Sequence, residues 1–260
     1  MHILTAMITL AIANHKGGAG KTTTAHNLGV ILAETTRVLL VDLDPQATLS
    51  KSAGVIDPQY TLADVLGSTQ PGKVAAAAAL VELTPNLAIL PSSLDLAVTE
   101  LGLGTRYARE MILRAALAPI AERFDVCLID CPPSLGQLTI NGLAMASGVI
   151  APTQPQPSDL HGLKSFLEII DQLRGALNPG LQLAGVLICQ YDGRTRLHKD
   201  AVQVIREALP TFETIIGNSI AVAEAPGVGQ AVVTYQPRNP QSENYRQFAG
   251  EVTAWLKNQT

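Results

Sequence analysis

The stretch that decides the fold is "ITLAIANHKGGAGKTTT", residues 8 to 24. It begins with a continuous apolar run, which is typical of a strand that is covered on both faces of a parallel sheet. The glycine-rich segment that follows leads directly into a predicted helix over 21–34, which is the context that a phosphate-binding loop requires. The sequence therefore predicts an α/β fold with a phosphate site at the carboxyl end of its first strand.

Further short apolar runs recur along the chain with helical stretches between them. The remaining strands are expected at 37–42, 87–90, 126–130, 148–152, 183–189 and 213–216. The remaining helices are expected at 106–122, 134–145, 159–177, 197–208 and 242–257. This pattern predicts a doubly wound, mostly parallel central sheet with helices on both faces. We expect residues 7–260 to form a single domain and residues 1–6 to be a short amino-terminal extension.

Composition narrows the class of protein. A chain of 260 residues with 47% apolar and 15% charged residues suits one large domain. Its net charge of −4 argues against a strongly basic nucleic-acid binder, so any DNA binding must come from a local patch. No run of 18 apolar residues and no signal peptide is present, which predicts a cytoplasmic protein.

The three cysteines lie within or beside apolar runs. Cys127, Cys131 and Cys189 are an odd number in a long chain. We therefore interpret them as small core residues in preference to metal ligands.

The glycine-rich loop carries groups suited to a bound nucleotide. Backbone N–H groups of such a loop turn toward phosphate oxygens, and the amino terminus of the next helix adds a partial positive charge. Lys21 is expected to reach the β and γ phosphates, and the Thr22 hydroxyl to ligate Mg²⁺. The residues expected to contact ATP here are Lys16, Gly17, Gly18, Ala19, Gly20, Lys21, Thr22 and Thr23.

The loop departs from the common phosphate-loop pattern, because His15 stands where its first glycine should be. Its form K-G-G-x-G-K-[ST], with "DLDPQAT" (42–48) and "LIDCPPSLG" (128–136), resembles the ParA/Soj branch of the deviant Walker ATPases, in the superfamily that includes MinD. The resemblance runs from Met7 to the last helix, through "YDGRTRL" (191–197). It implies ATP hydrolysis with Mg²⁺ as cofactor.

The resemblance also assigns roles to individual residues. It implies that Lys16 reaches across an ATP-sandwich homodimer to the phosphates of the other subunit; the alternative is a solvated loop lysine. It implies that Asp44 positions the attacking water, with Asp42 supporting the water shell of the metal. Thr22, Asp44 and Asp130 are the implied magnesium residues. Residues 132–136 resemble a switch segment that senses the γ-phosphate.

The adenine contacts are implied by position alone. The family takes them from a "P-R-N" segment after a late strand, and the matching place here reads Gly217, Asn218, Ser219. Backbone groups of Gly217 and Ser219 are the contacts that remain available to a base.

One stretch has a local excess of basic residues. "YDGRTRLHKDAVQVIR" (191–206) sets four cations against two carboxylates, and it matches the region in which ParA-like dimers contact DNA without sequence preference. The expected DNA-contacting residues are Arg194, Arg196, Lys199 and Arg206. The alternative is a solvated helix of mixed charge, and the second basic region of the family, near 217–222, lacks arginine here.

The resulting hypothesis is a nucleoid-associated partition ATPase that segregates a chromosome or plasmid. A ParB-type centromere-binding partner would stimulate its hydrolysis. The main alternative is a MinD/ParA-type positioning ATPase for another cargo, such as a carboxysome, a receptor cluster or a membrane site.

Other relatives of the fold suggest further alternatives. A metabolic amide-forming enzyme would use the same loop without a basic surface. Iron-protein relatives of nitrogenase are disfavoured, because no cysteine precedes Cys127. No membrane partner is expected, because the apolar stripe of the last helix suits packing on its own sheet better than lipid.

Overall fold

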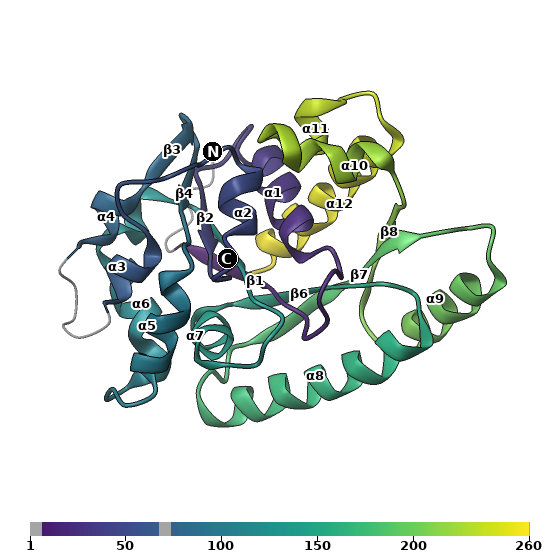
Figure 1. Cartoon of the computed structure of the whole chain (residues 1–260). Coiled ribbons are helices and arrows are strands. Elements are labelled where there is room, and N and C mark those ends of the chain that lie inside the picture. The colour runs from purple at the N-terminus through teal and green to yellow at the C-terminus, as the bar shows by residue number, and fades with distance from the viewer. Residues whose placement is uncertain (1–6, 68–73, 260) are drawn as a thin grey trace.

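The computed structural model describes residues 7–67 and 74–259, so the expected extension over residues 1–6 lies outside the described part. One eight-stranded sheet crosses the molecule in the order β3-β4-β2-β5-β1-β6-β7-β8 (Figure 1). The strands are β1 (Ile8–Ile12), β2 (Val38–Asp42), β3 (Val81–Thr84), β4 (Leu87–Leu90), β5 (Val126–Asp130), β6 (Gly148–Thr153), β7 (Gln182–Tyr191) and β8 (Thr211–Gly217). All neighbouring pairs are parallel except β3 and β4.

Helices cover both faces of this sheet, as the strand pattern predicts. One face carries α1 (Lys21–Leu32), α2 (Thr48–Ser52), α10 (Ile220–Glu224), η3 (Ala225–Val228), α11 (Val232–Tyr235) and α12 (Pro240–Lys257). The other carries α3 (Leu62–Leu66), α4 (Ala76–Ala79), α5 (Asp95–Leu103), η1 (Arg109–Met111), α6 (Ile112–Leu117), η2 (Ala118–Arg123), α7 (Gln137–Met145), α8 (Pro157–Ala176) and α9 (Arg196–Ala208). The doubly wound α/β fold is confirmed.

Alternation along each strand explains why the apolar runs are continuous. In β2, Leu39 and Val41 face one core while Val38 and Leu40 face the other. Because successive side chains point to opposite faces and both faces are covered, every position favours an apolar residue.

Two parts of the fold differ from the sequence expectation. The single helix expected over 106–122 is broken into η1, α6 and η2, and Pro119 lies at the start of η2, where it has no N–H for an α-helical hydrogen bond. Strand β3 and several short helices, including α5, were not predicted. Apart from α5, these elements span only four or five residues, too few for a periodic pattern.

The last helix packs where its apolar stripe predicts. Tyr245, Phe248 and Val252 are buried, and α12 lies against β8 and α1. Among the described helices, none combines the length and the apolar composition that a membrane crossing needs.

The contact between Gly148 and Trp255 provides a test of this packing. A Cβ at Gly148 would lie 2.5 Å from Trp255 Cη2 and 3.1 Å from Leu10 Cδ2. We expect Gly148→Ala to lower the free energy of unfolding by about 1–3 kcal/mol, the usual cost of overpacking. Trp255 is the one tryptophan of the chain, so its fluorescence follows urea unfolding directly.

Gly250→Ala on α12 is the matched control, because an added Cβ there meets nothing within 4 Å. Because alanine has a higher helix propensity than glycine, this substitution should raise the free energy of unfolding by up to about 1 kcal/mol. An unchanged urea midpoint for Gly148→Ala would contradict the packing described.

Candidate nucleotide and metal site

The three sequence motifs meet at the carboxyl edge of the sheet. β5 lies between β2 and β1, and the register pairs Asp130 with both Asp42 and Ile12. The chain leaving β1 therefore forms the glycine-rich loop beside the acidic ends of β2 and β5. Parallel strands bring their carboxyl ends to one edge, which is where α/β folds bind ligands.

The glycine-rich loop is fixed by side chains from both sides. Gly18 and Gly20 have φ values of 72° and 96°, the region that glycine adopts without strain. The carbonyl oxygen of Gly18 accepts hydrogen bonds from Gln154 Nε2 at 2.9 Å and from Gln190 Nε2 at 2.6 Å. These two amides hold the loop between β6 and β7, and neither was predicted from the sequence.

Lys21 lies at the base of the loop. Its side chain is buried, and its Nζ donates to the carbonyl oxygen of Lys16 at 3.0 Å. Burial lowers the pKa of Lys21, while the nearby Asp130 carboxylate acts in the opposite direction. A buried ammonium beside a loop of backbone N–H groups is suited to hold a polyphosphate.

Asp130 and Thr22 fit a magnesium site. Thr22 Oγ1 donates to Asp130 Oδ2 at 2.6 Å. Asp130 is 1% exposed, and its Oδ1 is buried with no hydrogen-bond partner among the described residues. Burial, reinforced by the neighbouring Asp42 carboxylate, raises the pKa of Asp130 well above its usual range. An unsatisfied buried oxygen beside a hydroxyl is a donor set that Mg²⁺ prefers.

Asp42 anchors the segment that carries Asp44. Its Oδ2 accepts from Ser50 N at 2.8 Å and from Ser50 Oγ at 2.6 Å, and its Oδ1 accepts from Asp44 N at 3.3 Å. Both carboxylate oxygens are thus used within the chain, and burial raises the pKa of Asp42 to about 6. Asp44, by contrast, is partly exposed, and its Oδ1 accepts from Gln46 N at 2.9 Å.

Lys16 forms an ion pair within its own chain. Its Nζ binds Asp159 Oδ1 in the first turn of α8, and its backbone N donates to Asn14 Oδ1 at 3.2 Å. The Lys16 side chain is 32% exposed and that of Asp159 is 1% exposed. Asp159 was not predicted as a site residue; it lies just beyond the carboxyl end of β6, at the sheet edge where α/β folds bind ligands.

A hollow of about 300 Å³ extends the site beside the loop. It brings Gly217 and Ser219 together with Gly20 and Thr23, four residues expected to contact ATP. The backbone N of Gly217 already donates to Gln241 Oε1 at 2.6 Å. The other residues that line the hollow are Cys189, Gln190, Ile216, Asn218, Val222, Ala223 and Tyr245.

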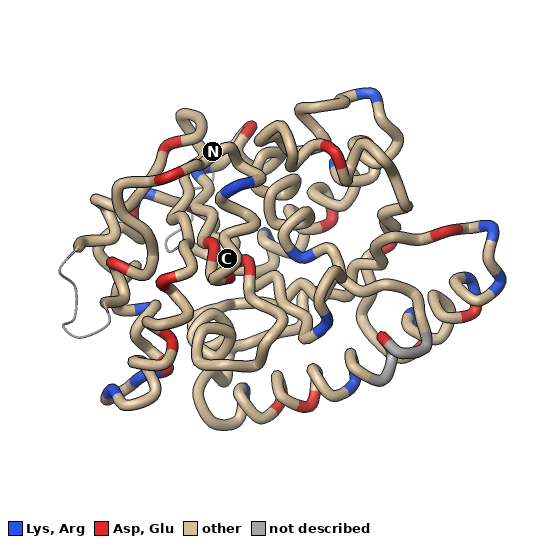
Figure 2. Tube along the Cα trace, in the orientation of Figure 1, with Lys and Arg blue, Asp and Glu red and all other residues tan. Residues whose placement is uncertain are grey.

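The basic stretch lies at a different part of the molecule, around the start of α9. Figure 2 shows Lys and Arg gathered there with acidic residues among them. Arg194 pairs with Asp192 at 2.9 Å and Arg196 with Asp200 at 3.6 Å, yet both arginine side chains are more than 90% exposed. Lys199 is exposed.

Arg206 differs from the other basic residues of α9. Its side chain is 39% exposed and binds Glu213, both its backbone carbonyl at 2.8 Å and its carboxylate at 3.4 Å. Arg206 is therefore tied to β8, and Arg194, Arg196 and Lys199 are the cations that project from this surface.

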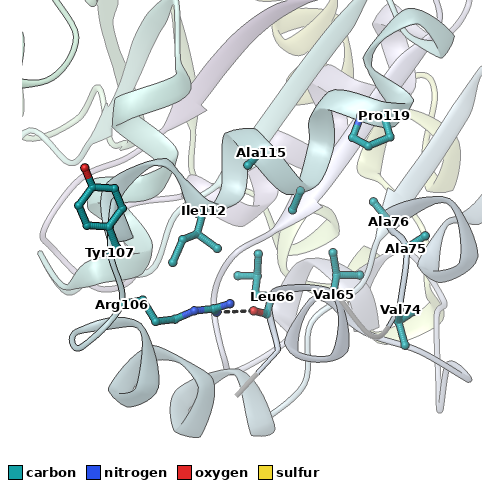
Figure 3. A pocket seen from close by; sticks show the side chains of 11 residues that line it. Val65, Leu66, Val74, Ala75, Ala76, Arg106, Tyr107, Ile112, Ala115 and Pro119 are labelled. Atoms are coloured by element: carbon teal, nitrogen blue, oxygen red, sulfur yellow. Dashed lines mark hydrogen bonds between the residues drawn. The ribbon is translucent and has the colours of Figure 1, made fainter. Parts of the chain in front are cut away.

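A larger apolar hollow of about 600 Å³ lies between α3, α4 and α6 (Figure 3). Among the described residues that line it, Arg106 is the charged one, and its guanidinium donates to the carbonyl oxygens of Leu66 and Gly67 at 2.6 Å and 3.0 Å. The groups suited to phosphate chemistry, Lys21, Thr22 and Asp130, lie in the smaller polar site instead.

The cysteines are core residues, as expected. Cys127, Cys131 and Cys189 are free and buried. Burial raises the pKa of all three thiols, that of Cys127 and that of Cys189 to about 12.

The chain is similar to known proteins over most of its length. A family profile described as an AAA domain matches residues 7–183. The chain is 40% identical to the chromosome partitioning protein ParA of Caulobacter vibrioides, covering 94% of this chain and 92% of that protein. It is 38% identical to the sporulation initiation inhibitor protein Soj of Bacillus subtilis, covering 94% and 98%.

A solved structure is also similar over nearly the whole chain. It is cobyrinic acid a,c-diamide synthase from Mycobacterium smegmatis with bound ATP analog and magnesium, at a TM-score of 0.85 and 36% identity, covering 98% of this chain and 97% of that one.

Asp42 gives the site a pH dependence that can be measured. Because folding raises its carboxyl pKa from 3.8 to about 6, the folded chain binds this proton more tightly than the unfolded chain. The protonated Asp42 carboxyl therefore stabilises the fold in full below 3.8, its pKa in the unfolded chain. This stabilisation is lost as the pH rises through about 6, its pKa in the folded chain. Between pH 4 and 7, nucleotide-free wild type should lose up to about 3 kcal/mol relative to Asp42→Asn, measured by urea unfolding.

Asp57→Asn, at an exposed turn, is the matched control and should keep the wild-type pH profile. If Asp42→Asn and wild type show parallel stability curves over this pH range, the buried carboxyl of Asp42 does not titrate as described.

Proposed function

The chain belongs to the ParA/Soj/MinD family of ATPases, and from this premise we propose that it is a partition ATPase that works as an ATP-dependent homodimer. In this proposal the dimer binds duplex DNA without sequence preference. A ParB-type partner then stimulates hydrolysis and releases it. The observation that carries the proposal is the pair of lysines in one loop, Lys21 turned inward and Lys16 held at the surface, beside Asp44 and Asp130.

The residues of one subunit supply most of a phosphoryl-transfer site. Lys21 and the loop N–H groups would hold the ATP phosphates, and Thr22 and Asp130 would hold Mg²⁺, which neutralises phosphate charge when bound. Asp44, partly exposed in the turn after β2, would orient the attacking water. Asp42 keeps that turn in place through Ser50.

The missing component is a cation that acts on the transferring phosphate in the final geometry. Lys16 is the candidate, but in the isolated chain its ammonium is paired with Asp159. If Lys16 moves to the nucleotide of a second subunit, its ammonium leaves the Asp159 carboxylate and binds a polyphosphate instead. The ion pair would hold the Lys16 side chain in place until two subunits meet, and hydrolysis would then depend on dimerisation.

The DNA proposal is supported by the surface around α9. Arg194, Arg196 and Lys199 project from the protein, and two such surfaces brought together in a dimer would double the number of phosphate contacts. The binding constants of the two surfaces multiply when both contact the same DNA. The dimer formed with ATP would therefore bind DNA more tightly than the monomer.

A second candidate function comes from the likeness to a diamide synthase. Such an enzyme would use the same loop to activate a carboxylate with ATP. The buried cysteines offer no accessible thiolate to release ammonia from glutamine, so an external ammonia source would be required. The third candidate function for the same site is that of an ATPase that positions a cargo other than DNA.

Mixing two inactive variants tests whether Lys16 acts on the neighbouring subunit. Lys16→Ala should bind ATP through Lys21 but lack the cation in trans, and Asp44→Ala should lack the water-positioning acid. In a mixed dimer, the Lys16→Ala subunit keeps its own Asp44 and receives Lys16 from its partner. An equal mixture should therefore regain roughly one quarter of wild-type hydrolysis, since half the dimers are mixed and one of their two sites is complete.

Lys164→Ala, an exposed lysine on α8, is the charge-matched control and should hydrolyse ATP as wild type does. If Lys16 acts on its own subunit, the mixture stays as inactive as its components. Wild-type hydrolysis by Asp44→Ala alone would contradict the role given to Asp44.

Binding to random duplex DNA tests the proposed partition function. We expect Asp44→Ala with ATP to bind, and binding to be weak with ADP or without nucleotide. Arg194→Ala and Arg196→Ala should each weaken binding on all sequences and lower the slope of log affinity against log salt by roughly one per lost phosphate contact. Filter binding at several salt concentrations gives both quantities.

Arg123→Ala on η2 removes the same charge from another surface and should leave the slope unchanged. If ATP-bound protein shows no DNA binding even at low salt, the partition function is wrong, and a non-DNA cargo or a small-molecule substrate remains.

A further inference from the structure

Helix α5 has an apolar face that none of the residues described by the structure, 7–67 and 74–259, covers. Leu94, immediately before the helix, Val98 and Leu101 are 68%, 63% and 80% exposed. Their spacing of four and three residues places them on one side of the helix. The opposite side is anchored to the core by Leu96 and Leu103, which are fully buried. We call the exposed set Leu94, Val98 and Leu101 the α5 stripe.

The stripe is large enough to require an explanation. Single exposed apolar residues are common on protein surfaces, but a contiguous set usually marks an interaction site. At roughly 100 Å² for each Val or Leu side chain, the α5 stripe presents about 300 Å². Helix α5 is therefore apolar on two sides, one of which is already buried in the core beside α3 and α7.

The position of α5 connects the stripe to the nucleotide site. The helix follows β4, the neighbour of β2, and packs beside α3 and α7. Glu100 of α5 accepts a hydrogen bond through Oε1 from Leu138 N at 3.1 Å, at the start of α7. The same carboxylate leaves no room for a Cβ at Gly136. Glu100 thus links α5 to the segment that leads from Asp130 to α7.

We propose that the α5 stripe packs against a second copy of this chain when ATP is bound. This inference rests on the proposed ATP-dependent dimer and names a surface for it. A two-fold pair brings the same patch of each subunit to one interface, so an apolar stripe meets an apolar surface. A second copy suits the stripe better than a basic segment, because its three side chains are apolar and Asp95 is the one exposed carboxylate of α5 beside them.

The size of the stripe also explains why the proposed dimer would form only when ATP is bound. Two stripes together would bury about 600 Å², whereas specific stable complexes bury about 1,200–2,000 Å². The stripe alone therefore cannot hold a dimer. It would add to an interface whose other part is formed by ATP and Lys16, and the Glu100 contact connects the stripe's helix to the segment between Asp130 and α7.

Paired serine substitutions test the proposal. In the Asp44→Ala background, Val98→Ser with Leu101→Ser should bind a fluorescent ATP analogue as the parent does but sediment as a monomer with ATP and Mg²⁺. Leu197→Ser with Val204→Ser, on α9, removes the same two residue types from side chains that are 53% and 51% exposed. This control should still dimerise. Figure 1 places α5 and α9 at opposite ends of the molecule.

A labelling experiment locates the contact without weakening it. The native cysteines are buried, so Leu101→Cys introduces an accessible thiol. In the Asp44→Ala background, ATP should slow maleimide labelling of Cys at position 101 by at least tenfold, and should leave Leu197→Cys equally reactive.

The outcomes separate this inference from the proposed function. If the Asp44→Ala parent does not dimerise with ATP, the proposed dimer itself is wrong. If the parent dimerises, but the Val98 and Leu101 variant dimerises equally and Leu101→Cys is not protected, the α5 stripe lies outside the interface and the inference is overturned. If Val98→Ser with Leu101→Ser leaves the dimer intact in the Asp44→Ala background but abolishes partner-stimulated hydrolysis when Asp44 is present, the stripe belongs to the partner interface and the inference is also overturned.

Discussion

The structure depends on a buried carboxylate that lacks part of its hydrogen bonding. Asp130 is at the end of a central strand, almost completely buried, with one oxygen bound to Thr22 and the other without a partner among the described residues. Leaving such a group unsatisfied is costly. A bound cation would lower this cost, so the buried oxygen of Asp130 favours cation binding at this place. Lys21 supplies part of that positive charge from the adjacent loop.

The remaining site residues keep this arrangement fixed. Gln154 and Gln190 hold the Gly18 carbonyl from two strands, which leaves the loop N–H groups free to face a phosphate. Asp42 fixes the turn that carries Asp44. Because these contacts exist before any nucleotide binds, the loop loses little conformational entropy on binding, which is the physical basis of a preorganised site.

The sequence predicted the parts of the site that lie on regular elements. Motifs at the ends of apolar runs located Lys21, Thr22 and Asp130, because parallel strands bring their carboxyl ends together whatever the connections between them. Gln154, Gln190 and Asp159 were missed, because their contacts join residues more than 130 positions apart and have no local pattern. The same limit applies to α5, whose exposed stripe cannot be told from a buried one until the sheet is placed.

Several interactions that are each weak can together make the proposed dimer depend on bound ATP. Lys16 has a carboxylate partner in its own chain, the α5 stripe is too small for a stable interface, and the arginines near α9 are partly neutralised by neighbouring carboxylates. Each would contribute fully only when ATP adds its charge at the subunit boundary. Contributions that become available together multiply their equilibrium constants, so a modest ligand-binding energy can change both assembly and DNA affinity. If instead each interaction were strong, the chain would stay assembled after hydrolysis and could not be released.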